Sequence, residues 1–397
     1  MKNKRIPFFR LGGVILGVVA SMTFLASCKD AGSNTQDQPL INTSIPKSPG
    51  AVVEPADNPS SAAKIELGRH LFYDKALSVD GSTSCGSCHQ VANGFSDVTS
   101  TSIGFEHQHG NRNAPALANV AYNTAFTWDG RFASLEKHAP GPIFNSLEMG
   151  NNFTNDPKAQ DSVPSGYNSK PGSNDTLMLF KRLSGRPGDL IGKTYGEMFT
   201  AAWGDSRVSM ERIAKSIAAF ERTLISTQSA FDKYNNGDAS ALKGNASALH
   251  GLQLFTDVNG ANCISCHSGY NFTDQQFHDN GIGLGPKMNM QPPDKGRSDV
   301  SQNSQDDYKF KTPSLRNVAL SGPYMHDGRF ASLYDVLGSY RKGGAHTTPY
   351  QDDKIEKIGQ MSLSDADVND IVEFLKTLTD FKFADKSNQA FSNPWGD

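Results

Sequence analysis

Two copies of the pentapeptide Cys-x-x-Cys-His, at residues 85–89 and 263–267, constrain this chain more than any other feature. In this pattern two thiols add to the vinyl groups of one porphyrin, and the adjacent imidazole binds one axial face of its iron. A Cys-x-x-Cys pair alone would also suit a redox dithiol or half of a zinc site, but a histidine follows both pairs. The sequence therefore predicts two covalently bound c-type haems. The predicted attachment and ligand residues are Cys85, Cys88 and His89 for the first haem, and Cys263, Cys266 and His267 for the second.

Haem attachment leaves one of the five cysteines, Cys28, which closes an N-terminal segment where basic residues precede an apolar run over residues 11–25. This order predicts a secretory signal peptide over residues 1–27. The residues Leu-Ala-Ser-Cys that end at Cys28 resemble a bacterial lipobox, which predicts a lipid anchor on Cys28 that holds the protein to a membrane. The alternative is ordinary cleavage, which leaves a soluble protein with a free thiol. Either outcome predicts a location outside the cytoplasm, in the periplasm or cell envelope.

The mature chain is expected to start with a flexible tether over residues 28–59, because this stretch is polar and rich in Pro, Ser and Asn. The residues that follow are enough for two domains of usual size. A net charge of −3, with 20% charged residues, gives no sign of nucleic-acid binding. Beyond the signal peptide we find no apolar stretch long enough to span a bilayer.

The body of the chain is an internal duplication. Residues 113–121 match residues 311–319, and residues 129–135 recur without change as residues 327–333. Both matches have the same separation, since Pro115 and Pro313 stand 198 positions apart, as do the first residues of the second match. Each half therefore predicts the same structural unit.

Segments with helical periodicity enclose each haem motif. They run over residues 62–73 and 246–255 upstream of the motifs, and over residues 210–226 and 366–378 downstream. Helix, haem motif, loops and closing helix is the order of a small class I cytochrome c domain. We therefore predict a mostly α protein with two tandem cytochrome c-like domains and long loops. The predicted bounds are 60–235 and 236–385, with a surface insertion over 151–175 and a tail over 386–397.

The residues resemble one known family, the bacterial di-haem cytochrome c peroxidases together with the related MauG enzymes. The resemblance covers residues 56–380 and rests on the combination of both haem motifs with several shorter ones. These are Asn113-Ala114-Pro115, Trp128–Arg131, Leu147–Gly150, Ala218–Leu224 and Pro323–Gly328. In that family the N-terminal haem reacts with hydrogen peroxide, and the C-terminal haem receives electrons from a small donor protein, such as a monohaem cytochrome c or a cupredoxin. Members are often dimers, which implies a possible homodimer.

Three residues take catalytic roles from this resemblance. Glu148 falls on the family's catalytic glutamate, which would take a proton from bound peroxide and return it to the leaving oxygen; the alternative is a solvated surface carboxylate. Trp128 matches a tryptophan between the haems that would shorten electron hops, a role compatible with simple core packing. His138 stands where classical members have a glutamine, so it would either tune proton delivery or replace the same hydrogen bond.

The first haem departs from the classical pattern on its distal side. Classical members place a histidine shortly before the Asn-Ala-Pro motif, where it blocks the peroxidatic iron until the other haem is reduced. The matching residue here is Phe105, which predicts a five-coordinate first haem at rest. His107 and His109 lie close by in the sequence and are the alternatives if the loop shifts.

The second haem departs at its sixth ligand, a methionine in classical members, placed fourteen residues after the residue that matches His326. Here that position is Tyr340, and MauG enzymes ligate iron through a tyrosine there. A phenolate stabilises ferric iron and lowers the potential, whereas methionine raises it. We therefore expect Tyr340 as the ligand. Met325, Met288 and a buried tyrosine that binds no iron are the alternatives.

The family also holds a calcium ion between its domains. Carrying its ligands over gives the Asn113 side chain and the main-chain carbonyls of Ser321 and Pro323, and such oxygen ligands suit calcium. An asparagine before Ala-Pro is also an ordinary turn residue.

The leading hypothesis is an exported cytochrome-c peroxidase, an oxidoreductase that reduces hydrogen peroxide to water with electrons from a small periplasmic donor. A second hypothesis is a MauG-like enzyme that oxidises a protein side chain or another reductant through a high-valent state shared by both haems. A third is a non-catalytic electron carrier. Glu148 and the missing sixth ligand at the first haem argue against the carrier, which would normally keep both irons saturated.

Overall fold

The computed structural model describes residues 44–151, 179, 183, 193–282, 294–346, 348 and 351–396. Contacts within the chain divide it into residues 1–38 and 39–397, and every described residue belongs to the second unit. The predicted signal peptide, Cys28 and Met288 lie outside the described residues. So do the first part of the tether and nearly all of the predicted insertion over residues 151–175.

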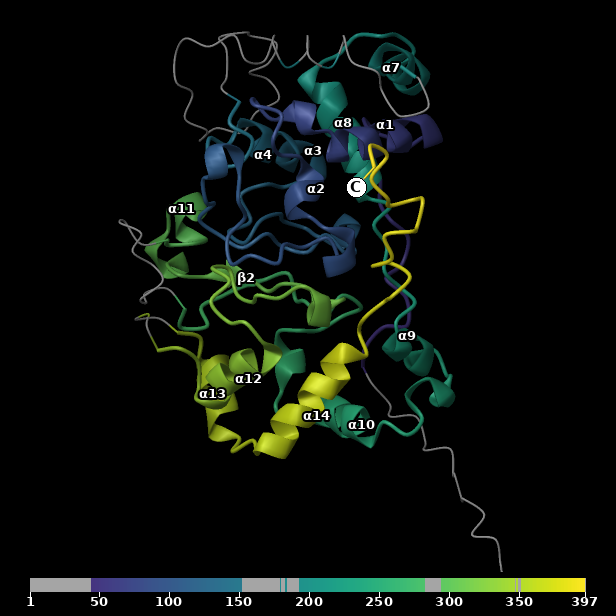
Figure 1. Ribbon diagram of the computed structural model, residues 1–397. Coiled ribbons are helices and arrows are strands. Elements are labelled where there is room, and N and C mark those ends of the chain that lie inside the picture. The colour runs from purple at the N-terminus through teal and green to yellow at the C-terminus, as the bar shows by residue number, and fades with distance from the viewer. Residues whose placement is uncertain are drawn as a thin grey trace, which may run out of the picture. The chain divides into compact units, whose positions relative to one another are not determined.

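The described chain is mostly helical, as predicted, with short elements joined by long loops (Figure 1). Its helices are α1 (Ala62–Tyr73), α2 (Cys85–Cys88), α3 (Leu135–His138), α4 (Pro140–Phe144), α7 (Tyr195–Trp203), α8 (Met210–Glu221), α9 (Ala230–Asn235), α10 (Ala246–Thr256), α11 (Ser298–Ser301), α12 (Leu333–Arg341), α13 (Asp353–Gln360) and α14 (Asp365–Lys376). The two short strands, β1 (Phe277–His278) and β2 (Phe310–Lys311), pair antiparallel, with Phe277 opposite Lys311. Among the described residues, no helix is long and apolar enough to cross a membrane.

The duplication appears in how each half packs its helices. In the first half α1 lies against α8, and in the second α10 lies against α14. Gly68 and Gly251 make these close approaches possible, because a Cβ atom at either position would overlap the main-chain oxygen of Ser216 or Asp370 on the facing helix. Each half encloses its own apolar cluster around these crossings.

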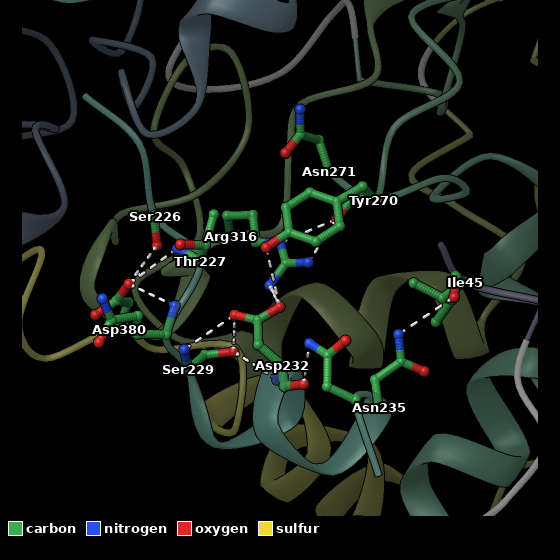
Figure 2. Close-up of polar contacts among 12 residues, drawn as sticks. Ile45, Ser226, Thr227, Ser229, Asp232, Asn235, Tyr270, Asn271, Arg316 and Asp380 are labelled. Carbon is green, nitrogen blue, oxygen red and sulfur yellow. Dashed lines mark hydrogen bonds and ion pairs between the residues drawn. The ribbon is translucent and has the colours of Figure 1, made fainter. Parts of the chain in front are cut away.

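A buried polar network supports the second half (Figure 2). Arg316 is only 1% exposed; it pairs with Asp232 at 2.6 Å and donates hydrogen bonds to the carbonyl oxygen of Tyr270. Its guanidinium also lies 4.0 Å from the centre of the Tyr270 ring. The carboxylate therefore meets a buried cation whose other donors are also satisfied, which limits the cost of burying the charge.

Ser226 joins the two repeats, because it binds one asparagine from each. The Asn119 side chain donates to the carbonyl oxygen of Ser226 at 2.9 Å, and the Asn317 side chain donates to its hydroxyl at 3.0 Å. Asn119 and Asn317 stand 198 positions apart in the sequence, and both adopt a left-handed backbone. The equivalent turns of the two repeats therefore converge on one residue.

Both ends of the described chain connect the halves. Ile45 is buried in the apolar cluster of the second half, whereas Asn58 donates a hydrogen bond to Glu136 in the first half. Residues 44–59 belong to the predicted tether, and these contacts link this described part of it to both halves. The C-terminal segment, yellow beside α1 in Figure 1, carries Phe391 into the cluster of the first half. There Trp395 donates its indole N–H to the carbonyl oxygen of His70.

Candidate haem-binding sites and the cavity beside them

Each predicted axial histidine is held by a main-chain carbonyl. The Nδ1 atom of His89 donates to Phe95 O at 3.0 Å, and Nδ1 of His267 donates to Phe272 O at 3.0 Å. Both phenylalanines have a left-handed backbone, with φ of 61° and 53°, so the same local turn occurs in both repeats. A bonded Nδ1–H leaves Nε2 as the atom available to a metal. Burial lowers the pKa of both imidazoles and so favours the neutral form that binds iron.

The four haem-motif cysteines, Cys85, Cys88, Cys263 and Cys266, are free thiols with no disulfide among them. Burial raises the pKa of the Cys88 thiol to about 11 and that of Cys263 to about 12. The second motif faces a cavity of about 230 Å³ whose apolar wall includes Phe255, Leu337 and Ile371. Paired thiols, a fixed imidazole and an apolar wall are the features that a covalently attached haem requires.

Glu148 lies beside the first haem motif, close enough to Cys85 and Cys88 for its charge to raise their thiol pKa values. The side chain of Asn145 donates to Glu148 Oε1 at 2.6 Å. Burial raises the pKa of the Glu148 carboxyl, while the positive charge of Arg131 and the hydrogen bond from Asn145 act in the opposite direction. The hydrogen bond from Asn145 therefore holds the carboxyl in place, and its raised pKa favours proton exchange nearer to neutral pH.

Phe105, in the position of the classical distal histidine, packs against the segment that carries Glu148. Its main-chain N–H donates to Glu148 O at 2.7 Å, and a Cβ atom on Gly150 would lie 2.6 Å from its ring. His107 and His109 are both exposed, and the ring of His109 hydrogen-bonds the hydroxyl of Thr101.

His138 lies near the first axial ligand, within an aromatic environment. Its ring stacks on Phe126 with centres 6.3 Å apart and meets Phe132 edge-on at 5.3 Å. The pKa of His138 is lowered to about 3, chiefly by burial, and positive charge on His89 acts in the same direction. His138 is therefore neutral near pH 7 and can act as a hydrogen-bonding group there, not as a fixed cation.

Trp128 lies on the wall of the same cavity as His138 and the second haem motif. Its indole N–H donates to Asn113 O at 2.8 Å, and its own carbonyl oxygen accepts from the Lys311 N–H at 2.8 Å. The main-chain N–H of Asn113 in turn donates to His326 O at 2.7 Å. Residues from both repeats thus fix the indole.

Tyr340 projects from α12 into the cavity, where Met325 also lies. Its pKa is raised to about 12, chiefly by burial; negative charge on Cys266 and Cys263 acts in the same direction, and a hydrogen bond from Asn280 opposes the shift. Asn280 also donates to the sulfur of Met325 at 3.4 Å. Tyr340 and Met325, two of the three candidate sixth ligands, therefore lie close together beside the second haem motif.

The three residues predicted to bind calcium, Asn113, Ser321 and Pro323, line this cavity together. The Nδ2 atom of Asn113 donates to Thr99 O at 3.1 Å, which leaves its Oδ1 atom as a possible ligand. The candidate set offers amide and carbonyl oxygens, which suit calcium, but it contains no carboxylate.

Sequence reasoning did not single out Arg131 or Lys311. The positive charge of Arg131 lowers the pKa of both Glu148 and His138. Lys311 is a buried lysine on the cavity wall. Both residues lie in the segments that the two repeats share, so the repeated sequence could have marked them as candidate site residues. A further cluster, Cys266, Asp274 and His278, has the spacing of a metal site, but haem attachment would use its thiol.

Two haem motifs, each with a carbonyl-anchored histidine and a helical cytochrome c-like unit, define a di-haem c-type cytochrome. A family model described as di-haem cytochrome c peroxidase matches residues 62–240, and one described as cytochrome c matches residues 248–379. The chain is 33% identical over 332 residues to the methylamine utilization protein MauG of Methylophilus methylotrophus, which covers 84% of this chain and 87% of the relative.

Two further comparisons agree. The chain is 34% identical over 335 residues to the cytochrome c551 peroxidase of Nitrosomonas europaea, with 82% and 84% of the two chains covered. A crystal structure of a MauG-like protein associated with microbial copper homeostasis superposes with a TM-score of 0.73 at 30% identity, over 89% of this chain and 99% of that one. The chain therefore belongs to the di-haem cytochrome c peroxidase family that includes MauG, as its motifs predicted. Its domains are those of a protein with two c-type haems.

Proposed function

We propose that this protein is a peroxidase that reduces hydrogen peroxide to water with electrons from a small donor protein such as a monohaem cytochrome c or a cupredoxin. The observation that carries the proposal is Glu148, a carboxyl beside the first haem motif whose pKa is raised by burial. Family membership supports the same reaction. Each turnover consumes one peroxide, two protons and two reduced donors, and yields two waters and two oxidised donors.

When bound, the haem irons supply the site for peroxide and the electron transfer. The protein's own contribution begins with Glu148, which accepts a proton from one peroxide oxygen and returns it to the other as the O–O bond breaks. Asn145 holds the carboxyl through Oε1. His138 is partly buried beside two aromatic rings and acts as a neutral hydrogen-bonding group in the same site. Trp128 carries electrons between the two halves.

We assign an open distal face to the first haem. Phe105 supplies no ligand atom, and its packing against Gly150 supports a fixed loop. His107 and His109 are exposed, so neither needs to move aside before peroxide enters. An enzyme of this kind would react with peroxide without prior reduction.

For the second haem we assign Tyr340 as the sixth ligand. Its place on the cavity wall beside Cys263 and Cys266 supports this assignment, and its match to the tyrosine of MauG enzymes favours it over Met325, which lines the same cavity. On binding iron, Tyr340 would lose its phenolic proton, and the resulting phenolate would stabilise the ferric state. This ligand also favours the second candidate function, a MauG-like oxidation of a protein side chain or another reductant. A carrier without catalysis is the weakest candidate, since it gives Glu148 no role.

Other assignments complete the proposal. Asn113, Ser321 and Pro323 bind one calcium ion at the cavity. The mature protein is exported to the periplasm and held to a membrane by a lipid on Cys28. Its domains span residues 60–235 and 236–385, and a homodimer is compatible with the family.

The test is steady-state oxidation of reduced monohaem cytochrome c by hydrogen peroxide, using the isolated enzyme before and after pre-reduction. Glu148→Gln should lower turnover about 100-fold or more, since a positioned acid–base group contributes at least that much. Glu356→Gln, at an exposed glutamate, is the matched control and should not change turnover. Absence of turnover by the wild-type enzyme in both redox states, despite reaction with peroxide, would favour the MauG-like function instead.

A further inference from the structure

The cavity beside the second haem motif is lined by two buried residues, Lys311 and His326, whose side-chain nitrogens form no hydrogen bond that links them to a described acceptor. Lys311 is 8% exposed, and no described residue forms a hydrogen bond or ion pair with its amine. His326 is 2% exposed, and its Nε2 atom has no hydrogen-bond partner. Both residues line the cavity together with Cys263, Cys266 and His267.

Contacts within the fold fix the main chain of Lys311 and the ring of His326. The main-chain N–H of Lys311 donates to Trp128 O at 2.8 Å, and strand β2 pairs Lys311 with Phe277. The His326 ring stacks on Phe310, with centres 3.6 Å apart and planes 10° apart. Because Phe310 and Lys311 are consecutive, one short strand supports both groups. Their position is thus set by the fold.

Burying the Lys311 amine without a counter-charge costs the protein free energy of folding. Burial lowers the pKa of Lys311 to about 8, and only the charge of Asp274 opposes the shift. Asp274 is already engaged by His278, whose Nε2 lies 2.8 Å from its Oδ2 atom. Buried charges are usually paired, so the site is suited to an anion that enters the cavity from outside the polypeptide.

We propose that Lys311 and His326 bind a propionate carboxylate of the haem attached at Cys263 and Cys266. The lysine ammonium would form a charge-assisted hydrogen bond to the carboxylate, and the His326 Nε2–H would donate a neutral one. This inference rests on the second haem site described above, but it does not depend on the reaction that the enzyme catalyses.

The pairing has a consequence for electron transfer. A lysine cation beside the haem stabilises the reduced iron relative to the oxidised iron, because reduction adds an electron to the site. Lys311 therefore raises the potential of the second haem, while a tyrosinate ligand lowers it. The cation would keep this haem reducible by a donor protein despite Tyr340.

The test is a spectroelectrochemical titration of the full-length, haem-loaded protein that resolves the two haems. Lys311→Met and Lys311→Gln remove the charge, and Lys311→Arg retains it. Lys309→Met is the matched control, because Lys309 lies two residues away, is partly exposed and pairs with Asp306. Haem content, measured as pyridine haemochrome, must remain two per chain. A wild-type content of one haem would contradict the site assignment itself, independently of the role of Lys311.

At the wild-type midpoint of the second haem, Lys311→Met and Lys311→Gln should lower the ferrous-to-ferric ratio at least tenfold, which corresponds to 59 mV for one electron. Lys311→Arg should recover most of this change, and Lys309→Met should shift the ratio less than threefold. His326→Leu should give a smaller decrease of the same sign. An unchanged second haem in the charge-removing variants, or a shift confined to the first haem, would overturn the proposal.

Discussion

Trp128 and His326 occupy equivalent positions in the two repeats, and the main chain of one residue, Asn113, joins them. Asn113 accepts the indole N–H of Trp128 through its carbonyl oxygen at 2.8 Å, and its own N–H donates to the carbonyl oxygen of His326 at 2.7 Å. The duplicated position has thus kept its place in both halves while its side chain has diverged. The indole side is suited to carrying electrons, and the imidazole side faces the second haem motif.

This relationship predicts the effect of Trp128→Phe. The change removes the indole and its hydrogen bond to Asn113, so electron transfer between the halves should slow and steady-state turnover should fall. The lost hydrogen bond should cost about 1 kcal/mol of stability. Stopped-flow spectroscopy of the reduced enzyme can separate the electron-transfer step from the peroxide reaction. Trp203→Phe, which loses a similar indole bond to Ser216 away from the cavity, should leave that step unchanged.

The pH dependence of the peroxide reaction should report Glu148. Its pKa is raised above the ordinary value of 4.5 by burial, and the unprotonated carboxylate is the form that accepts the proton. The rate should therefore rise with pH through a midpoint higher than 4.5. Arg131→Gln removes a charge that lowers this pKa, so it should move the midpoint to still higher pH. A profile of kcat/KM against pH measures both, and a midpoint unmoved by Arg131→Gln would contradict the assignment.

Tyr340→Met should raise the potential of the second haem, because a thioether favours ferrous iron more than a phenolate does. We expect at least a tenfold increase in the ferrous-to-ferric ratio at fixed ambient potential, or 59 mV. Redox titration checks the shift, and the loss of the tyrosinate signature in the ferric spectrum checks the ligand. Tyr334→Phe, at an exposed tyrosine of the same helix, is the control. Unchanged spectra in Tyr340→Met would favour Met325 or another ligand.

Glu221 should make stability depend on pH. This residue is 4% exposed, its Oε2 atom has no partner among the described residues, and burial raises its pKa to about 8. Because the folded pKa exceeds the unfolded one, the folded state loses stability as pH rises from about 4.5 to about 8. Glu221→Gln should therefore stabilise the protein by about 3 kcal/mol at pH 7 and have little effect at pH 4. Thermal unfolding at the two pH values measures the difference; equal effects at both would argue against this titration.

The helix crossing at Gly68 predicts a large loss of stability for Gly68→Ala. The added Cβ would overlap the main-chain oxygen of Ser216 on α8, and such overpacking typically costs about 1–3 kcal/mol. Gly338→Ala is the matched control, since Gly338 lies in α12 with nothing within 4 Å of an added Cβ. That change should stabilise the helix by up to about 1 kcal/mol. Thermal midpoints of the two variants should therefore move in opposite directions.

Some of the fold could be predicted from local pattern because local physics sets it. The helical segment over residues 62–73 is α1 with the same bounds, as its periodicity and the Ser61 cap require. The predicted closing helix over residues 210–226 ends earlier, at Glu221. Beyond that point Ser226 is held by asparagines from both repeats, a contact that no local pattern contains.

By itself the sequence indicated two haems, the duplication and the family, and it predicted the cysteines and histidines that would hold the haems. These follow from short motifs whose chemistry depends on neighbouring residues. Only the tertiary structure decided which side chains gather in the cavity and which of them lack a partner. Lys311 and His326 are fifteen positions apart in the sequence, and their importance depends on burial and on the absence of a described counter-charge. Burial and pairing are properties of the packed chain, because distant segments must meet before either exists.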